Sequence, residues 1–151
     1  MSTCSSTDAP LQLLRPPDVM GMGRVIVNAR AARTRSAGTN SAMERDIGIS
    51  RESLGSQQIY SAVVITAPGG KTDAHHHAEC ETAIYVLKGS ARYRFGDHLE
   101  HEVCADEGDF VYIPAHVVHT EANLSESEEL HVLVTRNCPG PKTIVLFKEN
   151  A

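Results

Sequence analysis

From Gly55 onward the sequence is a succession of short apolar runs, each closed by Gly, Pro or Asp. Runs of this length, rich in β-branched residues or alternating in polarity, are typical of strands, and the residues between them are typical of turns. The expected strands are residues 58–66, 82–89, 90–95, 99–105, 109–114, 129–136 and 142–147. Strands spaced about 8–12 residues apart, with no long amphipathic helix among them, predict an all-β sandwich or barrel.

The N-terminal part of the chain has a different character. Residues 1–23 contain three prolines and several Ser, Thr and Gly residues, which predicts an irregular arm. Residues 24–27 ("RVIV") are a candidate short strand, and residues 31–51 show no clean period, so we expect a covering loop there. The predicted organisation is an N-terminal arm and covering segment over residues 1–55, followed by a β-barrel over residues 56–151.

Composition excludes several classes of function. The chain of 151 residues is long enough for one domain with a core, and its net charge of −5 offers no basic surface for nucleic acid or for a membrane. No apolar stretch approaches the about 20 residues of a membrane span, and the N-terminus lacks the features of a signal peptide. The four cysteines, at positions 4, 80, 104 and 138, form no Cys-x-x-Cys pair. We therefore expect a cytoplasmic protein with reduced thiols.

Three consecutive histidines stand out in the stretch "PGGKTDAHHHAEC". If this segment is extended, His75 and His77 point to one face and His76 points to the other. Two imidazoles on one face can reach a single ion, and imidazole nitrogen suits Fe, Mn, Ni and Zn. Glu81 and the distant His119 could join them in the mouth of a barrel, leaving the open positions that a catalytic metal needs. The alternative is a solvated polar patch.

The spacing of these residues resembles the first motif of the cupin family, G-x5-H-x-H-x3-4-E-x6-G. The matching residues are Gly69, His75, His77, Glu81 and Gly89. Seven residues separate Glu81 from Gly89 instead of six, so counting back from the glycine puts Thr82 in the place of the carboxylate. A β-bulge would absorb the extra residue and leave Glu81 as the ligand. A site of three histidines without a carboxylate is the fallback.

A second stretch resembles the other cupin motif, G-x5-P-x-G-x2-H-x3-N. The matching residues are Gly108, Pro114, His119 and Asn123, while His116 replaces the glycine. A glycine at that position usually serves a turn, so His116 has to tolerate the backbone conformation of the turn. The resemblance covers residues 57–136, and the two motifs occur in the expected order.

The resemblance implies a double-stranded β-helix jelly-roll barrel of the small, one-barrel type. It also implies a divalent transition metal (Fe, Mn, Ni or Zn) held by His75, His77, Glu81 and His119. The family includes dioxygenases, decarboxylases and isomerases, so we expect a metalloenzyme that acts on a small molecule. The alternative is a non-catalytic cupin that binds or senses a small ligand. Small cupins often form dimers, and a homodimer is therefore expected.

Three further residues are candidate substrate contacts. Arg92 and Arg94 share one face of the expected strand 90–95, and if this face lines the barrel, a guanidinium could clamp an anionic ligand. Tyr85 could offer a hydroxyl to the same cavity. Solvent-facing arginines and a core tyrosine are the alternatives. Cys80 would favour zinc if its thiolate were a ligand, and a small buried residue is the other interpretation.

Overall fold

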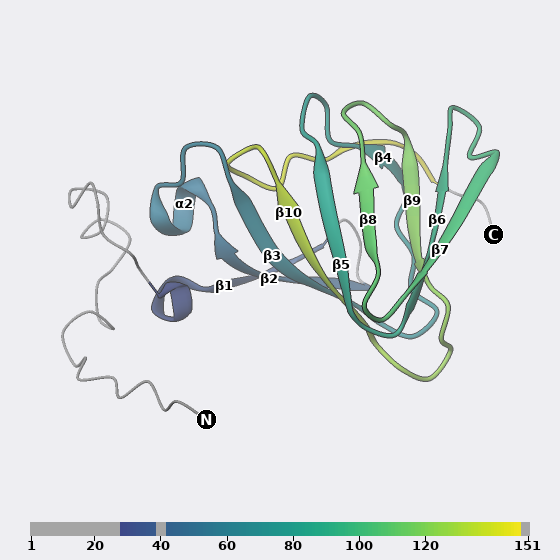
Figure 1. The fold of residues 1–151 in the computed structure, drawn as a ribbon, viewed down its shortest axis with the longest axis horizontal. Coiled ribbons are helices and arrows are strands. Elements are labelled where there is room, and N and C mark those ends of the chain that lie inside the picture. The colour runs from purple at the N-terminus through teal and green to yellow at the C-terminus, as the bar shows by residue number, and fades with distance from the viewer. Residues whose placement is uncertain (1–27, 39–41, 149–151) are drawn as a thin grey trace.

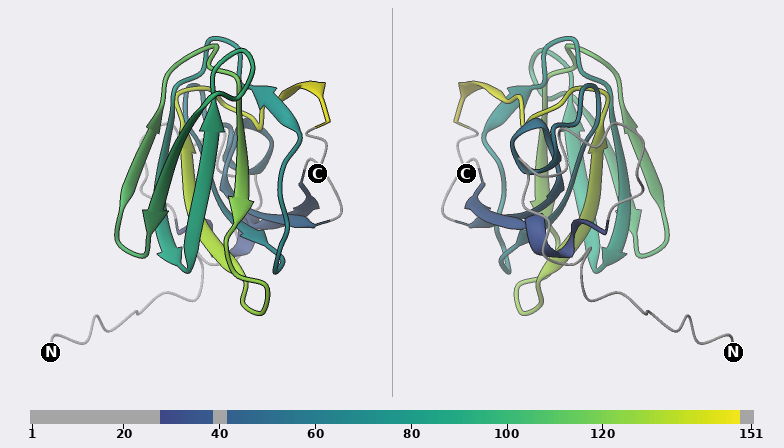
Figure 2. Two further views of the ribbon diagram at one scale, coloured as in Figure 1. Left: turned by 90° about the vertical axis from the view of Figure 1, so that its right-hand side faces the viewer. Right: turned by 90° about the vertical axis from the view of Figure 1, so that its left-hand side faces the viewer.

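The computed structural model describes residues 28–38 and 42–148. Its strands form two antiparallel sheets that face each other and enclose the core, as Figures 1 and 2 show. The prediction of an all-β jelly-roll barrel is confirmed. The predicted arm over residues 1–23 and the candidate strand over residues 24–27 lie outside the described residues.

The first sheet has six strands in the order β1-β2-β3-β10-β5-β8. In this order the strands are Thr34–Ala37, Met43–Ile49, Tyr60–Thr66, Leu130–Arg136, Thr82–Lys88 and Phe110–Ile113. The second sheet has five strands in the order β11-β4-β9-β6-β7. They are Ile144–Phe147, Ala74–His76, His119–Asn123, Ser90–Phe95 and His101–Asp106. The chain thus crosses repeatedly between the sheets, which is the path of a jelly roll.

The described residues form two short helices, the 3-10 helix η2 (Ala29–Ala32) before β1 and the helix α2 (Arg51–Leu54) between β2 and β3. None of the helices in the described part of the chain has the length and apolar content to cross a membrane. Ser50 caps the N-terminus of α2, where its side chain accepts a hydrogen bond from the backbone of Ser53, and Gly55 caps the C-terminus in the left-handed conformation.

The expectation of a covering loop over residues 31–51 is wrong, because β1 and β2 lie in this stretch and β2 pairs with β3 along its length. The strand period of β2 is hidden by a bulge between Ile47 and Ile49. Asp46 and Ile47 are both buried, and the Asp46 carboxylate forms an ion pair with Arg33. Two neighbouring buried residues, one of them charged, break the alternation that identifies a strand. The boundary between residues 55 and 56 stays a prediction.

The core lies between the two sheets and is built from alternate residues of their strands. Ile84 and Val86 on β5 face Ala91 and Tyr93 on β6, and all four are less than 5% exposed. Burying a side chain such as Val86 stabilises the fold by about 1.5–3 kcal/mol. Since inward and outward residues alternate, the same register decides which polar residues enter the barrel.

A disulfide bond joins Cys80 and Cys138, whose Cα atoms are 5.8 Å apart. This overturns the expectation of reduced thiols and leaves the sulfur of Cys80 unavailable as a zinc ligand. The bond links the turn after β4 to the segment between β10 and β11, 58 residues further on. Sequence spacing does not reveal such a pair, because only the fold brings the two residues together. Cys104 is an exposed free thiol.

Candidate metal centre

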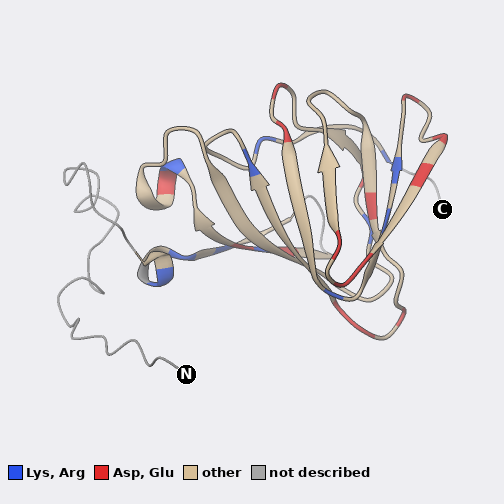
Figure 3. Ribbon diagram, in the orientation of Figure 1, with Lys and Arg blue, Asp and Glu red and all other residues tan. Residues whose placement is uncertain are grey.

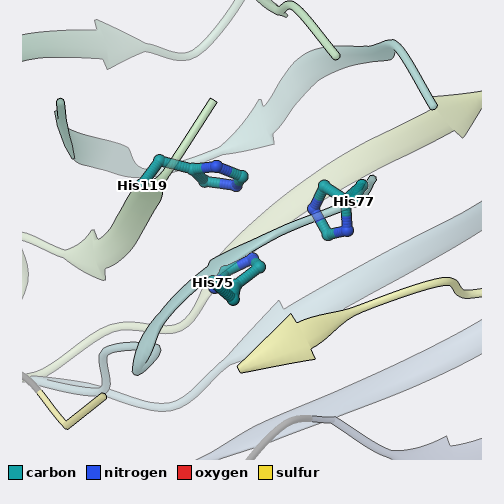
Figure 4. A group of neighbouring side chains, drawn as sticks. All are labelled: His75, His77 and His119. Atoms are coloured by element: carbon teal, nitrogen blue, oxygen red, sulfur yellow. The ribbon is translucent and has the colours of Figure 1, made fainter. Parts of the chain in front are cut away.

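Three buried histidines meet inside the barrel. His75 on β4 pairs with His119 at the start of β9, and His77 follows directly after β4. Each is 4–5% exposed, and their rings turn toward one another in Figure 4. One ring nitrogen from each residue lies within 4.8 Å of the other two. This separation suits three ligands around one ion.

Backbone carbonyls fix the tautomer of all three rings. The Nδ1 atom of His75 lies 2.7 Å from the Asp73 carbonyl. The Nδ1 atom of His77 lies 2.6 Å from the Lys142 carbonyl, and that of His119 lies 2.9 Å from the Val117 carbonyl. A carbonyl oxygen only accepts, so each Nδ1 carries the proton and donates it. The lone pair is then on Nε2 of each ring, which is the arrangement of metal-binding histidines.

Burial keeps the three imidazoles neutral. It lowers the pKa of His75 to about 4, that of His77 to about 2 and that of His119 to about 3. The positive charge of Arg136 lowers the pKa of each of the three rings further. Neutral rings do not have to lose a proton before binding a cation, so the donor set fits a divalent transition metal at neutral pH.

Arg136 is a residue of the site that the sequence reasoning missed. It ends β10, is 8% exposed, and donates from Nη2 to Nε2 of His77 at 3.1 Å and from Nε to the Thr82 hydroxyl at 3.2 Å. Burial lowers its pKa to about 10, so it remains charged at neutral pH. Arg45 on β2 lines the same cavity. The alternation of strand 130–136 predicts that Arg136 points inward, because it continues the series of Leu130, Val132 and Val134.

Glu121 is the second missed residue. It lies two positions after His119 on the same face of β9, and it is 7% exposed in the histidine cavity. Burial raises the pKa of this carboxyl, and a side-chain hydrogen bond with Tyr93 opposes that rise. The neighbouring hydroxyl thus offsets part of the cost of burying the carboxyl.

The structure places Glu81 outside the group of three histidines. Its carboxylate accepts hydrogen bonds from the hydroxyl of Tyr112 and from the side chain of Asn137, on the exposed side of the sheet. Thr82 begins β5, points inward and lines the cavity, in the position that counting back from Gly89 indicates. The geometry therefore brings together the three-histidine set without Glu81.

The predicted substrate contacts lie on outer faces. Arg92 and Arg94 alternate with the buried Ala91 and Tyr93 on β6. The Arg92 side chain is 42% exposed and lies 3.9 Å from Glu102, and Arg94 donates to the carbonyl of Leu99. Tyr85 is on the outer face of β5, with its ring 4.8 Å from that of Phe110. None of the three lines the histidine cavity.

The other two histidines of the motifs stay outside the centre. His76 points away from His75 and His77, and its Nδ1 accepts from the backbone of Ala78 at 3.0 Å. His116, in the glycine position of the second motif, has a φ of 64°. The turn therefore keeps the left-handed conformation that glycine favours, at a steric cost to His116.

Comparisons with known proteins agree with this geometry. The sequence model of the family described as "Cupin domain" matches residues 62–136. No curated protein matches the chain. Oxalate decarboxylase from Lactobacillus farciminis aligns with a TM-score of 0.64 and 24% identity, over 74% of this chain and 33% of that chain. The chain thus spans about a third of that enzyme.

Two further solved structures show how widely the fold is shared. Bacillus subtilis oxalate decarboxylase, described with Mn(II) centres, aligns with a TM-score of 0.63 and 23% identity, over 71% of this chain and 29% of that chain. Peruvianin-I, a cysteine peptidase from Thevetia peruviana latex, aligns with a TM-score of 0.65 and 12% identity, over 77% and 74% of the two chains. Identities this low establish the fold and leave the activity open. With the matched domain, the two sheets and the three inward histidines together, the chain belongs to the cupin superfamily.

Proposed function

We propose that this cupin is a metalloenzyme that acts on a small carboxylate, with a divalent transition metal on His75, His77 and His119. The observation that carries the proposal is the group of three buried, neutral imidazoles beside a buried guanidinium group in one cavity. Fe, Mn, Ni and Zn all suit imidazole ligands. The Mn(II) centres of the Bacillus subtilis decarboxylase make manganese the first ion to test.

Three protein ligands leave coordination positions open, and a metal there would act as a Lewis acid on a bound carboxylate or carbonyl. This chemistry serves decarboxylation or isomerisation, and with a redox-active ion it also serves oxygen-dependent cleavage. Among these classes decarboxylation is the first to test, because the matching solved structures include oxalate decarboxylases. A non-catalytic ligand-binding cupin would use the same cavity but release no product.

Arg136 would bind the carboxylate. Its Nη2 donates a hydrogen bond to Nε2 of His77, the atom whose lone pair a metal would need. A metal held by His77 would use this lone pair, which would leave the Arg136 donor free for a ligand in a cavity that Arg45 also lines. A guanidinium group matches a carboxylate with two parallel hydrogen bonds.

The test compares two arginine variants of the Mn(II)-reconstituted protein. We expect Arg136→Gln to weaken the binding of oxalate by about tenfold or more, since a buried charge-assisted hydrogen bond contributes about 1.5–3 kcal/mol. Arg92→Gln, which removes an exposed guanidinium, should leave binding unchanged. The measurement is isothermal titration calorimetry, together with release of carbon dioxide from oxalate and other small carboxylates. Carboxylate binding or turnover that survives removal of the metal contradicts the proposal.

The predicted homodimer is supported by the outer face of the first sheet. On four of its six strands, β3, β10, β5 and β8, the outward residues carry one charged side chain, Lys88 at the end of β5, and these strands are almost wholly tan in Figure 3. Phe110 is 80% exposed and Tyr112 is 62% exposed on this face. A two-fold interface places the same residues opposite each other, and the one lysine of this face is paired with Glu128, so the face meets its own copy with little like-charge repulsion. We propose that a second copy of the chain covers it.

A cytoplasmic location stays a prediction. The Cys80–Cys138 disulfide is a feature more usual in oxidising compartments.

A further inference from the structure

A second cavity adjoins the histidine cavity and is lined mainly by apolar side chains of β6, β7, β8 and the turn before β9. Its lining includes Tyr93, Phe95, Val103, Val111 and Val117. Ile113 and His119 line both cavities. His119 and Ile113 therefore lie where the two cavities meet.

This second cavity is accessible and incompletely filled. Val103 is 44% exposed at its rim, and Val111 and Val117 are only partly buried where they pack against the core. The walls thus present apolar surface to a space that no described side chain occupies. Apolar cavities of this kind favour an apolar ligand over water.

A polar junction connects the two cavities. Tyr93, only 2% exposed, lines the second cavity, and Glu121 lines the first. The charge of Glu121 and its side-chain hydrogen bond with Tyr93 contribute to the raised pKa of Tyr93, after the larger effect of burial, so the two groups are close neighbours. The pair thus joins the walls of the two cavities.

We propose that the substrate is a carboxylate with an apolar aliphatic or aromatic body, whose carboxylate lies beside Arg136 and whose body occupies the second cavity. The inference rests on the proposed function and narrows its substrate class. Oxalate has no apolar part and would leave the second cavity unused. A monocarboxylate of several carbons fills both cavities around His119.

The expected signature is an affinity that rises with apolar chain length. Each methylene group removed from water should strengthen binding about threefold to fourfold. The test is calorimetric titration of the Mn(II)-loaded protein with acetate, butyrate, hexanoate and 3-phenylpropionate. We expect the dissociation constant to fall by more than tenfold from acetate to hexanoate.

A pair of variants locates the effect. Val103→Phe narrows the rim of the second cavity and should weaken hexanoate and 3-phenylpropionate binding about tenfold while leaving acetate unchanged. Leu124→Phe is the matched control, because Leu124 is also 44% exposed but does not line the second cavity. Thermal melting confirms that each variant is folded, and Val103→Leu replaces Val103→Phe if the larger side chain prevents folding.

The outcomes separate this inference from the proposed function. If acetate and hexanoate bind with equal affinity, or if Leu124→Phe weakens hexanoate as much as Val103→Phe, the apolar subsite is refuted while the metal and arginine site stands. If none of the carboxylates binds the Mn(II)-loaded protein, the proposed function fails and the inference fails with it.

Discussion

At the scale of the residue, the centre depends on keeping three imidazoles neutral and each in one tautomer. The Nδ1 protons are directed to backbone carbonyls, and burial prevents a second proton from binding. Metal competence is therefore built into the metal-free protein. The same burial makes folding depend on pH in a direction that can be calculated.

The metal-free protein should lose stability as the pH falls below about 6.5. The unfolded chain binds protons at its histidines there, whereas folded His75 and His119 resist protonation down to a pKa of about 4 and about 3. Each such histidine lowers the free energy of unfolding by up to about 1.4 kcal/mol per pH unit, and has no effect well above pH 6.5. Urea unfolding at pH 7.5 and pH 5 measures the difference. His119→Gln should show a smaller difference in the free energy of unfolding between the two pH values. If the variant shows the same difference as the wild type, burial of His119 does not cause the pH dependence.

Single residues also show what the sequence could and could not predict. The strand period correctly separated His76 from His75 and His77, because alternation is a local property. The choice between Glu81 and Thr82 could not be made, because it depends on where β5 begins. Arg136 and Glu121 follow the strand alternation that predicts an inward position, but their roles depend on contacts between strands far apart in the sequence.

At the scale of the element, the site is held by pairings that bring distant segments together. β4 and β9 pair at His75 and His119, and β10 carries Arg136 alongside β5. The segment after β10 supplies the Lys142 carbonyl that fixes the His77 ring. The Cys80–Cys138 bond ties this segment to the turn that follows His77.

Removing the disulfide should lower the free energy of unfolding and loosen the segment whose Lys142 carbonyl holds the His77 ring. A bond that closes a loop of this length contributes about 2–4 kcal/mol, chiefly by restricting the unfolded chain. We expect Cys138→Ser to reduce the free energy of unfolding by this amount in chemical denaturation. Cys104→Ser, which changes an exposed free thiol, is the control and should have little effect. Equal stability of the two variants would mean that the bond contributes nothing to the fold.

Strands could be predicted from the sequence where buried and exposed residues alternate without interruption. Strands such as β3 and β10 follow the alternation closely, and the sequence located them within a few residues. The strands β1 and β2 were missed. The four residues of β1 are all exposed, and β2 contains a bulge and a buried ion pair. Neither carries a period that distinguishes a strand from a loop.

At the scale of the whole molecule, the two faces of the first sheet have different roles. The inner face builds the core and the wall of the cavity, while the outer face presents mostly uncharged and aromatic residues along β3, β10, β5 and β8.

The dimer proposed on this outer face should appear in solution, and light scattering should then give twice the mass of the chain. Phe110→Glu places a charge on the proposed interface and should give a monomer, whereas Leu146→Glu, 49% exposed on β11, should leave the dimer intact. A wild-type monomer would contradict the dimer.

The metal content of the protein tests the central claim most directly. Elemental analysis after purification without added metal, and again after reconstitution with Mn(II), should find one transition-metal ion per chain. His75→Gln and His119→Gln should lose this ion, while His76→Gln and Glu81→Gln should retain it, because only the first two residues belong to the buried group. A protein that binds no metal, or that keeps its metal in His119→Gln, would contradict the account.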